Sequence, residues 1–475
     1  MRARDVSFLQ MAQLRVIVIG LLFAAGCREP PGPSAIDECE ACFFPAPRHL
    51  ERLVAARVGP RSACVDTAAL ASHARLDALV PELLRARGLT LDPGACEWPL
   101  TFVAQSGALG SLSSQAQAAL AQAGDRPERY AVVTSVVAGH AATQLFAASE
   151  AGARHALTIA LALPEPSTVV DWPGFATRGV VEGFYGVPFS PGDRRETLRK
   201  MEQLRQNTYL YGPKDDPFAR ERWAEPYPSQ EAQEIADAAA EAEAHLVNFV
   251  WSISPALGVG VAAPGASIHY ASDADFQRLV AKIESVRALG VTRFALFLDD
   301  VQPMLVWDDD RAAFASLAEA HASLMNRLQV YLLTRDPSAR LLTVGQAYTS
   351  IVDGWQAYND VLGAALRPDI EVLWTGPRTF SDTIVASDLD AIDGKLARQV
   401  TIWDNWPIVV EPLTGRSADL PTRTRGILSN AILSEEGHPT RDTWTVLGPI
   451  ADYTWNPDAY DASRSGARWA ALLSR

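Results

Sequence analysis

Short, uninterrupted runs of apolar residues recur through the larger, C-terminal part of the chain, and each ends in glycine or polar residues. A run of this length predicts a strand that is buried on both faces, which is the usual state in a parallel sheet. The eight runs cover residues 177–184, 208–213, 246–254, 293–300, 340–348, 370–376, 399–406 and 426–431.

Segments with helical spacing separate these runs, and a last helix is predicted at about 441–453, whereas the seventh connection has little helix signal. Eight strands that alternate with helices over roughly 280 residues match an α/β fold, the (β/α)8 TIM barrel. An open doubly wound sheet is disfavoured, because no Gly-rich phosphate-binding sequence follows the first strand. The helical segments are 192–205, 228–244, 273–289, 310–334, 355–366 and 383–397.

The residues before the barrel have a mixed pattern, which predicts a small α+β domain. Helical spacing and short strands both occur there, and Asp171-Trp172-Pro173-Gly174 interrupts the pattern and marks a boundary. The predicted helices are 70–87 and 152–163, and the predicted strands are 100–105, 129–137 and 143–147.

The N-terminus has the features of an export signal. Arg2, Arg4 and Arg15 precede the apolar run 16–25, which is too short to span a membrane as a mature helix. The run ends in Ala-Ala-Gly-Cys27, which resembles a bacterial lipobox and implies lipidation of Cys27 and anchoring at the cell envelope. An ordinary secreted protein is the alternative. The predicted order is signal peptide 1–27, Pro-rich tether 28–44, α+β domain 45–172, barrel 173–457 and short C-terminal tail 458–475.

Four further cysteines, an even number in an exported chain, predict disulfides. They are Cys39, Cys42, Cys64 and Cys96, and they allow three connectivities, one of which joins Cys39 to Cys42 and Cys64 to Cys96. A metal site is the weaker interpretation, because no histidine lies near Cys39 and Cys42.

The net charge of the chain restricts the classes of partner that it can bind. The 475-residue chain has a formal net charge of -14, which argues against nucleic acid as a partner because phosphate contacts need a basic face. The same charge makes a polyanionic substrate less favourable, although a local basic patch could override it. With 48% hydrophobic residues the chain can form a sizeable core.

The fourth predicted strand, residues 293–300 (RFALFLDD), ends in two adjacent carboxylates, Asp299 and Asp300. In parallel α/β folds the site lies at the carboxyl ends of the strands, so this pair is a candidate catalytic pair. The alternative is a pair of solvated loop aspartates before the next helix. The other polar or aromatic residues at strand ends are Gly183, Lys214, Tyr348, Trp374, Trp403, Asn405 and Asn430.

These residue types suit a neutral sugar, and neither metal-ligand spacing nor a Ser-His-Asp triad is evident. Two adjacent carboxylates cannot easily flank a glycosidic bond from opposite sides. They can serve a substrate-assisted reaction, in which the sugar's 2-acetamido oxygen attacks the anomeric carbon. One aspartate then orients the acetamido group, and the other acts as general acid and base.

Six segments together resemble glycoside hydrolase family 84, the O-GlcNAcases and bacterial β-N-acetylglucosaminidases. The resemblance implies that Asp299 polarises the acetamido group and that Asp300 is the general acid/base. It implies sugar contacts for Gly183, Lys214, Tyr348, Trp403, Asn405 and Asn430, and it leaves Trp374 as a possible contact. The segments are 178–186 (RGVVEGFYG), 207–217 (NTYLYGPKDDP), 253–255 (ISP), 299–300 (DD), 374–377 (WTGP) and 403–405 (WDN).

One departure concerns the residue that grips the outer hydroxyls of the sugar in this family. Val410 stands where the resemblance expects an aspartate, and the neighbouring Glu411 is the possible substitute.

Taken together, the strand-end residues and the resemblance lead us to expect a β-N-acetylglucosaminidase that retains configuration, needs no cofactor and acts as a monomer on a GlcNAc-containing glycan or glycoprotein. The alternative is a non-hydrolytic glycan-binding lipoprotein on the same barrel.

Overall fold

The computed structural model describes residues 45–52, 60–71, 73–92, 96–104, 110–137, 139–163, 165–257, 267–405, 413–430 and 441–473. All of them fall in one unit of the chain, Ala41–Arg475. The predicted signal peptide and tether, with Cys27, Cys39, Cys42 and Glu411, lie outside the described residues. Within this part of the chain, no helix is long and apolar enough to cross a bilayer.

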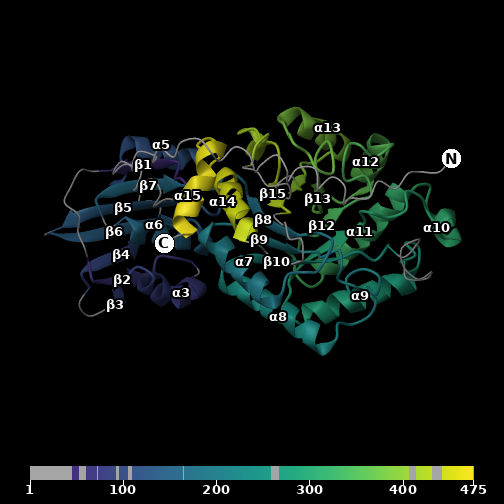
Figure 1. The fold of residues 1–475 in the computed structure, drawn as a ribbon, viewed down its shortest axis with the longest axis horizontal. Coiled ribbons are helices and arrows are strands. Elements are labelled where there is room, and N and C mark those ends of the chain that lie inside the picture. The colour runs from purple at the N-terminus through teal and green to yellow at the C-terminus, as the bar shows by residue number, and fades with distance from the viewer. Residues whose placement is uncertain are drawn as a thin grey trace, which may run out of the picture. The chain divides into compact units, whose positions relative to one another are not determined.

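The first domain is a seven-stranded mixed sheet with helices, which confirms the α+β prediction (Figure 1). The strand order is β1-β7-β5-β6-β4-β2-β3, antiparallel from β1 to β6 and parallel from β6 to β3. Its elements are β1 (His49–Arg52), β2 (Ser62–Asp66), α3 (Ala74–Arg85), β3 (Thr90–Leu91), β4 (Trp98–Phe102), α5 (Ser114–Gln122), β5 (Tyr130–Val137), β6 (His140–Ala147), α6 (Glu150–Ala162) and β7 (Ser167–Asp171).

A disulfide joins Cys64 in β2 to Cys96, which lies just before β4. It links neighbouring parallel strands and closes a loop of the chain with a sequence separation of 32. Closing such a loop stabilises the domain mainly by restricting its unfolded chain. A bond between Cys64 and Cys96 belongs to the connectivity in which Cys39 would pair with Cys42, one of the three that the sequence allows.

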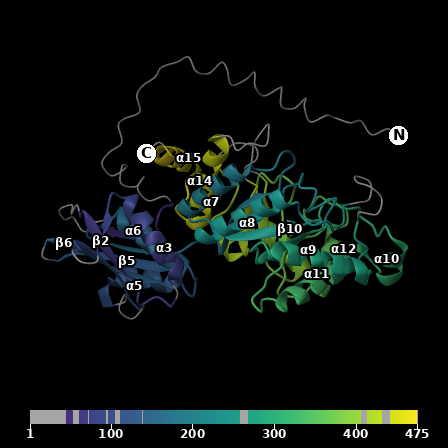
Figure 2. The ribbon, with the colours of Figure 1, turned by 90° about the horizontal axis from the view of Figure 1, so that it is seen from below.

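The second domain is a closed barrel of eight parallel strands, which confirms the TIM-barrel prediction (Figures 1 and 2). The strands are β8 (Thr177–Glu182), β9 (Thr208–Tyr211), β10 (Asn248–Ile253), β11 (Arg293–Phe297), β12 (Leu342–Val344), β13 (Glu371–Trp374), β14 (Thr401–Asp404) and β15 (Gly426–Ser429). The helices between and after them are α7 (Pro191–Gln203), α8 (Ser229–Ala244), α9 (Asp273–Arg287), α10 (Asp308–Ala313), α11 (Leu317–Leu333), α12 (Trp355–Ala365), α13 (Ala386–Leu396), α14 (Arg441–Trp455) and α15 (Ala462–Leu473).

Alternation along the strands builds two cores. In β11, Ala295 and Phe297 belong to the cluster inside the barrel, whereas Phe294 and Leu296 belong to the cluster between the strands and the helices. Both faces are apolar, which is why these strands appear in the sequence as continuous runs. Asp299 and Asp300 follow this strand at its carboxyl end.

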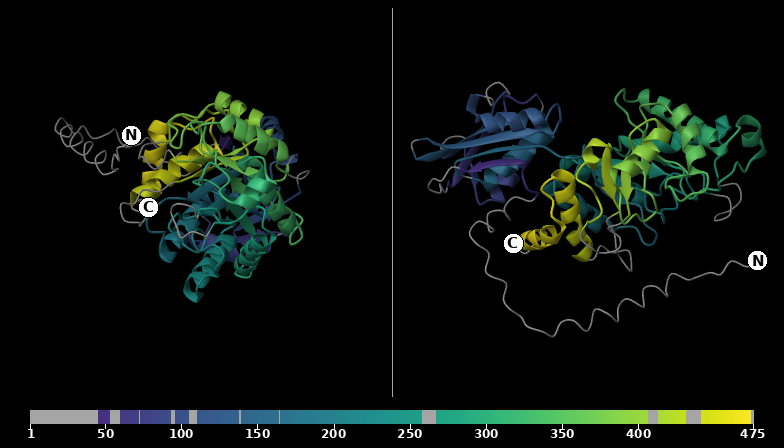
Figure 3. Two further views of the ribbon diagram at one scale, coloured as in Figure 1. Left: turned by 90° about the vertical axis from the view of Figure 1, so that its right-hand side faces the viewer. Right: turned by 90° about the horizontal axis from the view of Figure 1, so that it is seen from above.

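Two predicted segments differ in the structure. The helix predicted at 310–334 is two helices, α10 and α11, because Ser316 caps α11 by accepting a hydrogen bond from the Glu319 N–H. The predicted short tail contains α15, which lies beside α14 (Figure 3). Trp469 of α15 packs over Gly448 of α14, and a Cβ at that glycine would lie 2.1 Å from the indole.

A buried network of charges joins the sheet domain to the barrel. Glu128 accepts hydrogen bonds from Arg178 at the start of β8 and lies 3.1 Å from His155. Burial alone would raise the pKa of Glu128, but Arg178 and His155 hold it well below its usual range. Asp171 accepts hydrogen bonds from Arg205 at 3.0 Å and from Trp455 at 2.8 Å.

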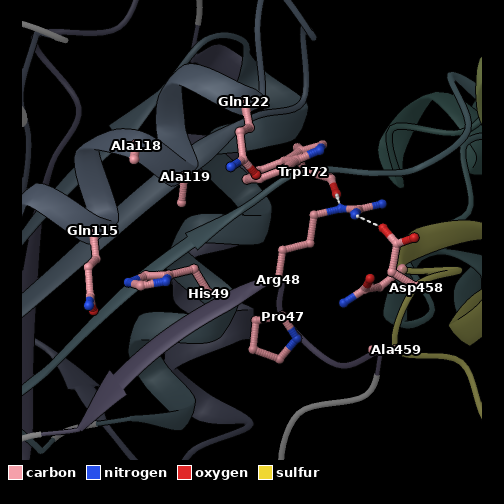
Figure 4. Close-up of a pocket in the computed structure, with 11 residues that line it drawn as sticks. Pro47, Arg48, His49, Gln115, Ala118, Ala119, Gln122, Trp172, Asp458 and Ala459 are labelled. Carbon is pink, nitrogen blue, oxygen red and sulfur yellow. Dashed lines mark hydrogen bonds and ion pairs between the residues drawn. The ribbon is translucent and has the colours of Figure 1, made fainter.

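A cavity of about 510 Å³ lies beside this junction, next to α5 and the residues after α14 (Figure 4). The Arg48 side chain donates to the Trp172 carbonyl at 3.0 Å and pairs with Asp458 at 2.9 Å. None of the candidate site residues lines it. This cavity therefore belongs to the junction between the domains.

Candidate active site

Every candidate that the sequence placed at a strand end lies at or just beyond the carboxyl end of a barrel strand. Gly183 follows β8, Lys214 lies beyond β9, Asp299 and Asp300 follow β11, and Tyr348 lies beyond β12. The remaining ones are Trp374 in β13, Trp403 in β14, Asn405 after β14 and Asn430 after β15. Because all eight strands are parallel, these positions share one face of the barrel.

The two aspartates have different surroundings, although they are neighbours in sequence. Asp299 is buried, with 9% of its side chain exposed, and its carboxylate pairs with Lys214. Asp300 has 33% of its side chain exposed, and its Oδ2 lies 3.6 Å from the Lys214 Nζ. One carboxylate is thus held against a buried ammonium group, while the other is partly exposed to solvent.

Asp300 is held by two tyrosine hydroxyls. Tyr185 donates to Oδ2 at 2.9 Å, and Tyr348 donates to Oδ1 at 3.3 Å. Burial and the charge of Asp300 raise the pKa of each tyrosine to about 12, so both hydroxyls remain protonated donors at neutral pH. The backbone of Asp300 is left-handed, with φ +55°, which is uncommon for a residue other than glycine.

A second group of side chains forms an amide cluster that is made of Asn405, Asn430 and Trp403. The Asn405 Oδ1 accepts from the Trp403 indole at 2.8 Å and from the Asn430 Nδ2 at 3.0 Å. The Asn405 Nδ2 donates to the Thr379 carbonyl at 2.8 Å. The buried Oδ1 of Asn430 has no hydrogen-bond partner among the described residues.

Aromatic rings connect the aspartates to the amide cluster. The Lys214 Nζ lies 5.6 Å from the Trp403 ring centroid and 5.9 Å from that of Phe297, and the two rings are 5.3 Å apart. A Cβ at Gly183 would lie 2.2 Å from Trp403. Only glycine therefore fits at position 183 while the indole keeps this place.

Buried ion pairs and hydrogen bonds fix the loops that carry the site. Glu182 is fully buried, pairs with Arg194 at 2.9 Å and accepts from the Phe189 N–H at 2.9 Å, which ties down the loop carrying Tyr185. Asp216 accepts from the hydroxyl groups of Tyr211 at 2.8 Å and Tyr227 at 2.6 Å, two residues beyond Lys214.

The structure thus brings eight predicted residues together: Gly183, Lys214, Asp299, Asp300, Tyr348, Trp403, Asn405 and Asn430. Trp374 is different, because its side chain belongs to the core between the strands and the helices, where it packs. Sequence reasoning missed Tyr185, and the available signal was its place in the loop after the first barrel strand. Among the described residues, no group of His, Cys, Asp or Glu side chains could hold a metal ion.

Known proteins resemble this chain in both sequence and structure. A model of the beta-N-acetylglucosaminidase family matches residues 178–474, which include all the residues of the site. This chain belongs to that family. The resemblance to glycoside hydrolase family 84 is therefore confirmed, and the family is one of glycoside hydrolases.

Two curated relatives of this family member are the protein O-GlcNAcases of Rattus norvegicus and Mus musculus. They are 32% and 31% identical to it, over 53% and 56% of this chain. The alignments cover only 27% and 29% of those proteins, so this chain spans under a third of their length.

This chain also resembles solved structures in its fold. A mutant of the Thermobaculum terrenum O-GlcNAc hydrolase is 28% identical, with a TM-score of 0.57 over 63% of each chain. CpGH84B has a TM-score of 0.72 over 91% of this chain and 74% of its own, at 21% identity, so it supports the fold alone.

Proposed function

We propose that this protein hydrolyses terminal β-linked GlcNAc with retention of configuration, by substrate-assisted catalysis. The observation that carries the proposal is the pair Asp299 and Asp300: one carboxylate is buried on Lys214, and its neighbour is more exposed and held by two tyrosines. Two carboxyl groups in contrasting surroundings can take different roles in one reaction. Their adjacency fits a reaction in which the substrate supplies the nucleophile.

In the first step, the acetamido N–H of the sugar donates to Asp299, and the acetamido oxygen attacks the anomeric carbon. The bond to the leaving oxygen breaks as Asp300 gives that oxygen its proton, and a cyclic oxazoline forms on the sugar. In the second step, Asp300 takes a proton from water, which attacks the anomeric carbon and reopens the ring. Two displacements at one carbon return the original configuration.

The remaining residues of the site hold the sugar. Lys214 and the Gly183 carbonyl contact hydroxyl groups of the sugar. Tyr348 and Trp403 line the pocket that holds its acetamido group. The Asn430 Oδ1, which is buried and free of partners among the described residues, accepts a hydrogen bond from the sugar. Asn405 lies beside it and supplies the amide that orients Asn430.

The class of substrate follows from the relatives. The rat and mouse proteins are named protein O-GlcNAcases, and the Thermobaculum terrenum enzyme is named an O-GlcNAc hydrolase. We infer that this chain also removes O-linked GlcNAc from a glycoprotein or related glycan.

The test is hydrolysis of 4-methylumbelliferyl β-GlcNAc by the wild type, Asp299→Asn and Asp300→Asn. We expect each variant to lose about 10²- to 10⁴-fold in kcat, the range for a lost acid–base group. Azide should restore part of the Asp300→Asn activity, because it attacks the oxazoline without a general base. It should not rescue Asp299→Asn, in which the acetamido group is no longer polarised.

Asp308→Asn is the matched control, since Asp308 is an exposed aspartate soon after the same strand. It should keep wild-type activity. A wild type that binds a thiazoline mimic of the oxazoline without turnover would replace this proposal with the glycan-binding alternative. Equal cleavage of an aryl β-glucoside, which lacks the acetamido group, would rule out substrate assistance.

We also propose that the chain is exported and anchored through a lipid on Cys27. The basic and apolar N-terminal pattern supports export, and the Cys64–Cys96 disulfide supports an oxidising compartment. Metabolic labelling with palmitate should mark the wild type and leave Cys27→Ser unlabelled. Labelling of Cys27→Ser would refute the anchor.

A further inference from the structure

Large apolar side chains that remain exposed gather at the face of the barrel that carries the candidate active site. Among the residues that the structure describes, ten such side chains are exposed, and six of them lie in the loops that follow β8, β11, β12 and β13. Single exposed apolar residues are normal, whereas a group gathered beside a site is typical of a surface that binds a partner. The six, which we call the apolar rim, are Tyr185, Val187, Met304, Ile351, Phe380 and Val385.

The apolar rim has two sides, and Asp300 lies between them. The loop after β8 brings the Tyr185 hydroxyl to the Asp300 Oδ2 at 2.9 Å, and the loop after β12 brings the Tyr348 hydroxyl to its Oδ1 at 3.3 Å. In the closed barrel β8 and β12 are four strands apart, so their loops face each other across the mouth. Val187 therefore stands on one side of Asp300, and Ile351 stands on the other.

Hydrogen bonds hold the loops that carry the apolar rim. The Thr349 hydroxyl donates to the Gly376 carbonyl at 3.1 Å, which joins the loop of Ile351 to the loop of Phe380. Across the mouth, Glu182 ties down the loop after β8. The backbone of the rim is thus in place before a ligand arrives, so little binding energy is lost in ordering these loops.

The apolar rim lies where the leaving group of the proposed reaction must lie. Asp300 gives its proton to the leaving oxygen, so the group attached to that oxygen sits beside Asp300, between the two sides of the rim. Val187, Met304 and Ile351 offer this group aliphatic surface without a strong hydrogen-bonding side chain. Such a surface suits apolar side chains better than the hydroxyl groups of a second sugar, which would lose their hydrogen bonds to water.

A polypeptide also fits the two-sided form of the rim. It continues in both directions from the residue that carries the sugar, whereas an alkyl chain continues in only one. Building on the proposed function, we propose that the apolar rim selects polypeptide substrates in which apolar residues flank the serine or threonine that bears GlcNAc.

The test compares kcat/KM for β-GlcNAc substrates with different leaving groups. Two glycopeptides of equal length carry GlcNAc on a central serine, which is flanked by leucines in one and by glutamines in the other. N,N′-diacetylchitobiose has a sugar as leaving group, and monomeric octyl β-GlcNAc has an alkyl chain. The leucine glycopeptide should be cleaved about tenfold or more better than each of the others, because apolar contacts of this size give such discrimination.

The outcomes separate this proposal from the proposed function. Equal kcat/KM for the two glycopeptides, or a higher value for the chitobiose or the octyl glycoside, would overturn the role of the rim although the aryl β-GlcNAc substrate is cleaved. A chain that cleaves no β-GlcNAc substrate, the aryl one included, would overturn the proposed function and this proposal with it.

Two substitutions and a matched control connect the selectivity to the apolar rim. Met304→Ser and Ile351→Ser should each lower kcat/KM on the leucine glycopeptide about three- to tenfold, because each removes apolar contact area. The value for the glutamine glycopeptide should stay at that of the wild type. The two side chains are 63% and 62% exposed, so both variants should fold. Val330→Ser, at a 50% exposed valine on α11, is the control and should change neither value. Wild-type selectivity in both rim variants would overturn the proposal.

Discussion

Asp300 shows how much a single residue's chemistry depends on its backbone. Its backbone is left-handed, and its carboxylate accepts hydrogen bonds from Tyr185 and Tyr348, whereas the Asp299 carboxylate pairs closely with Lys214. The sequence was enough to single out both aspartates, because two charges at the end of an apolar strand are unusual. The tyrosine from the first strand's loop was missed, because its contact joins positions 115 residues apart.

Removal of the Tyr185 hydroxyl tests its action on Asp300. Tyr185→Phe should lower kcat about five- to tenfold with little change in KM, because a hydrogen bond to a charged group contributes roughly 1 kcal/mol at an exposed position. Steady-state kinetics on the aryl β-GlcNAc substrate give both constants. Tyr331→Phe is the matched control, since Tyr331 also donates to a carboxylate, Glu284, but on the outside of the barrel. Equal losses in the two variants would contradict a specific role for Tyr185.

At the scale of elements, apolar periodicity predicted all eight barrel strands but fewer strands of the sheet domain. Barrel strands are buried on both faces, so they stand out as continuous apolar runs. The missed strands β1 (HLER), β2 (SACVD), β3 (TL) and β7 (STVVD) are short and contain small or polar residues. Pairing with neighbours decides their structure, and one strand's own sequence does not encode that pairing.

The packing of α15 on α14 makes a matched pair of glycine substitutions informative. Gly448→Ala should destabilise the protein by about 1–3 kcal/mol, because its Cβ would enter the space of Trp469. Gly466→Ala, on the facing helix, has open space around its Cβ and should stabilise by about 0.5–1 kcal/mol through helix propensity. Urea unfolding measures both. Destabilisation by Gly466→Ala, or stabilisation by Gly448→Ala, would show that α15 does not pack as described.

A buried histidine between helices predicts a loss of stability in acid. His321 of α11 lies between the hydroxyls of Tyr270 at 3.0 Å and Tyr358 at 2.6 Å, and burial lowers its pKa to about 3. In the unfolded chain this histidine is protonated below its ordinary pKa of about 6.5, whereas in the folded chain it stays neutral down to about pH 3. The free energy of unfolding therefore falls as the pH is lowered from about 6.5 toward 3. The contribution approaches about 1.4 kcal/mol per pH unit.

His321→Gln should therefore flatten the dependence of the unfolding free energy on pH between about 6.5 and 4.5, even if it lowers stability at neutral pH. Chemical denaturation at a series of pH values measures that slope. His140→Gln, at an exposed histidine in β6, is the control and should leave the slope as in the wild type. An unchanged slope in His321→Gln would refute the assignment.

At the scale of the whole molecule, the sheet domain and the barrel are held together by buried charges. Glu128, Arg178 and His155 form one network, and Asp171 and Arg205 form its neighbour. No local pattern indicates these pairs, because their members lie far apart along the chain. The Pro-Gly break after Asp171 is the feature of the sequence from which a domain boundary is predicted.

Glu128→Gln should destabilise the protein by about 3–5 kcal/mol, because it leaves the buried guanidinium of Arg178 without its counter-charge. Activity per folded molecule should remain, since this network lies at the end of the barrel away from the site. Urea unfolding and an aryl β-GlcNAc assay measure the two effects. Glu225→Gln, which breaks an exposed pair with Arg222, should change neither measurably. A stable Glu128→Gln protein would contradict the described junction.

Trp455 at the end of α14 completes this junction, and its position in the chain has a consequence for synthesis. Its ring lies 5.0 Å from the Arg178 guanidinium and 4.6 Å from that of Arg205, and its indole donates to Asp171. Those three partners leave the ribosome more than two hundred residues before the tryptophan does. During synthesis these three charged groups are therefore made long before the tryptophan, and α14 adds the last member of the junction.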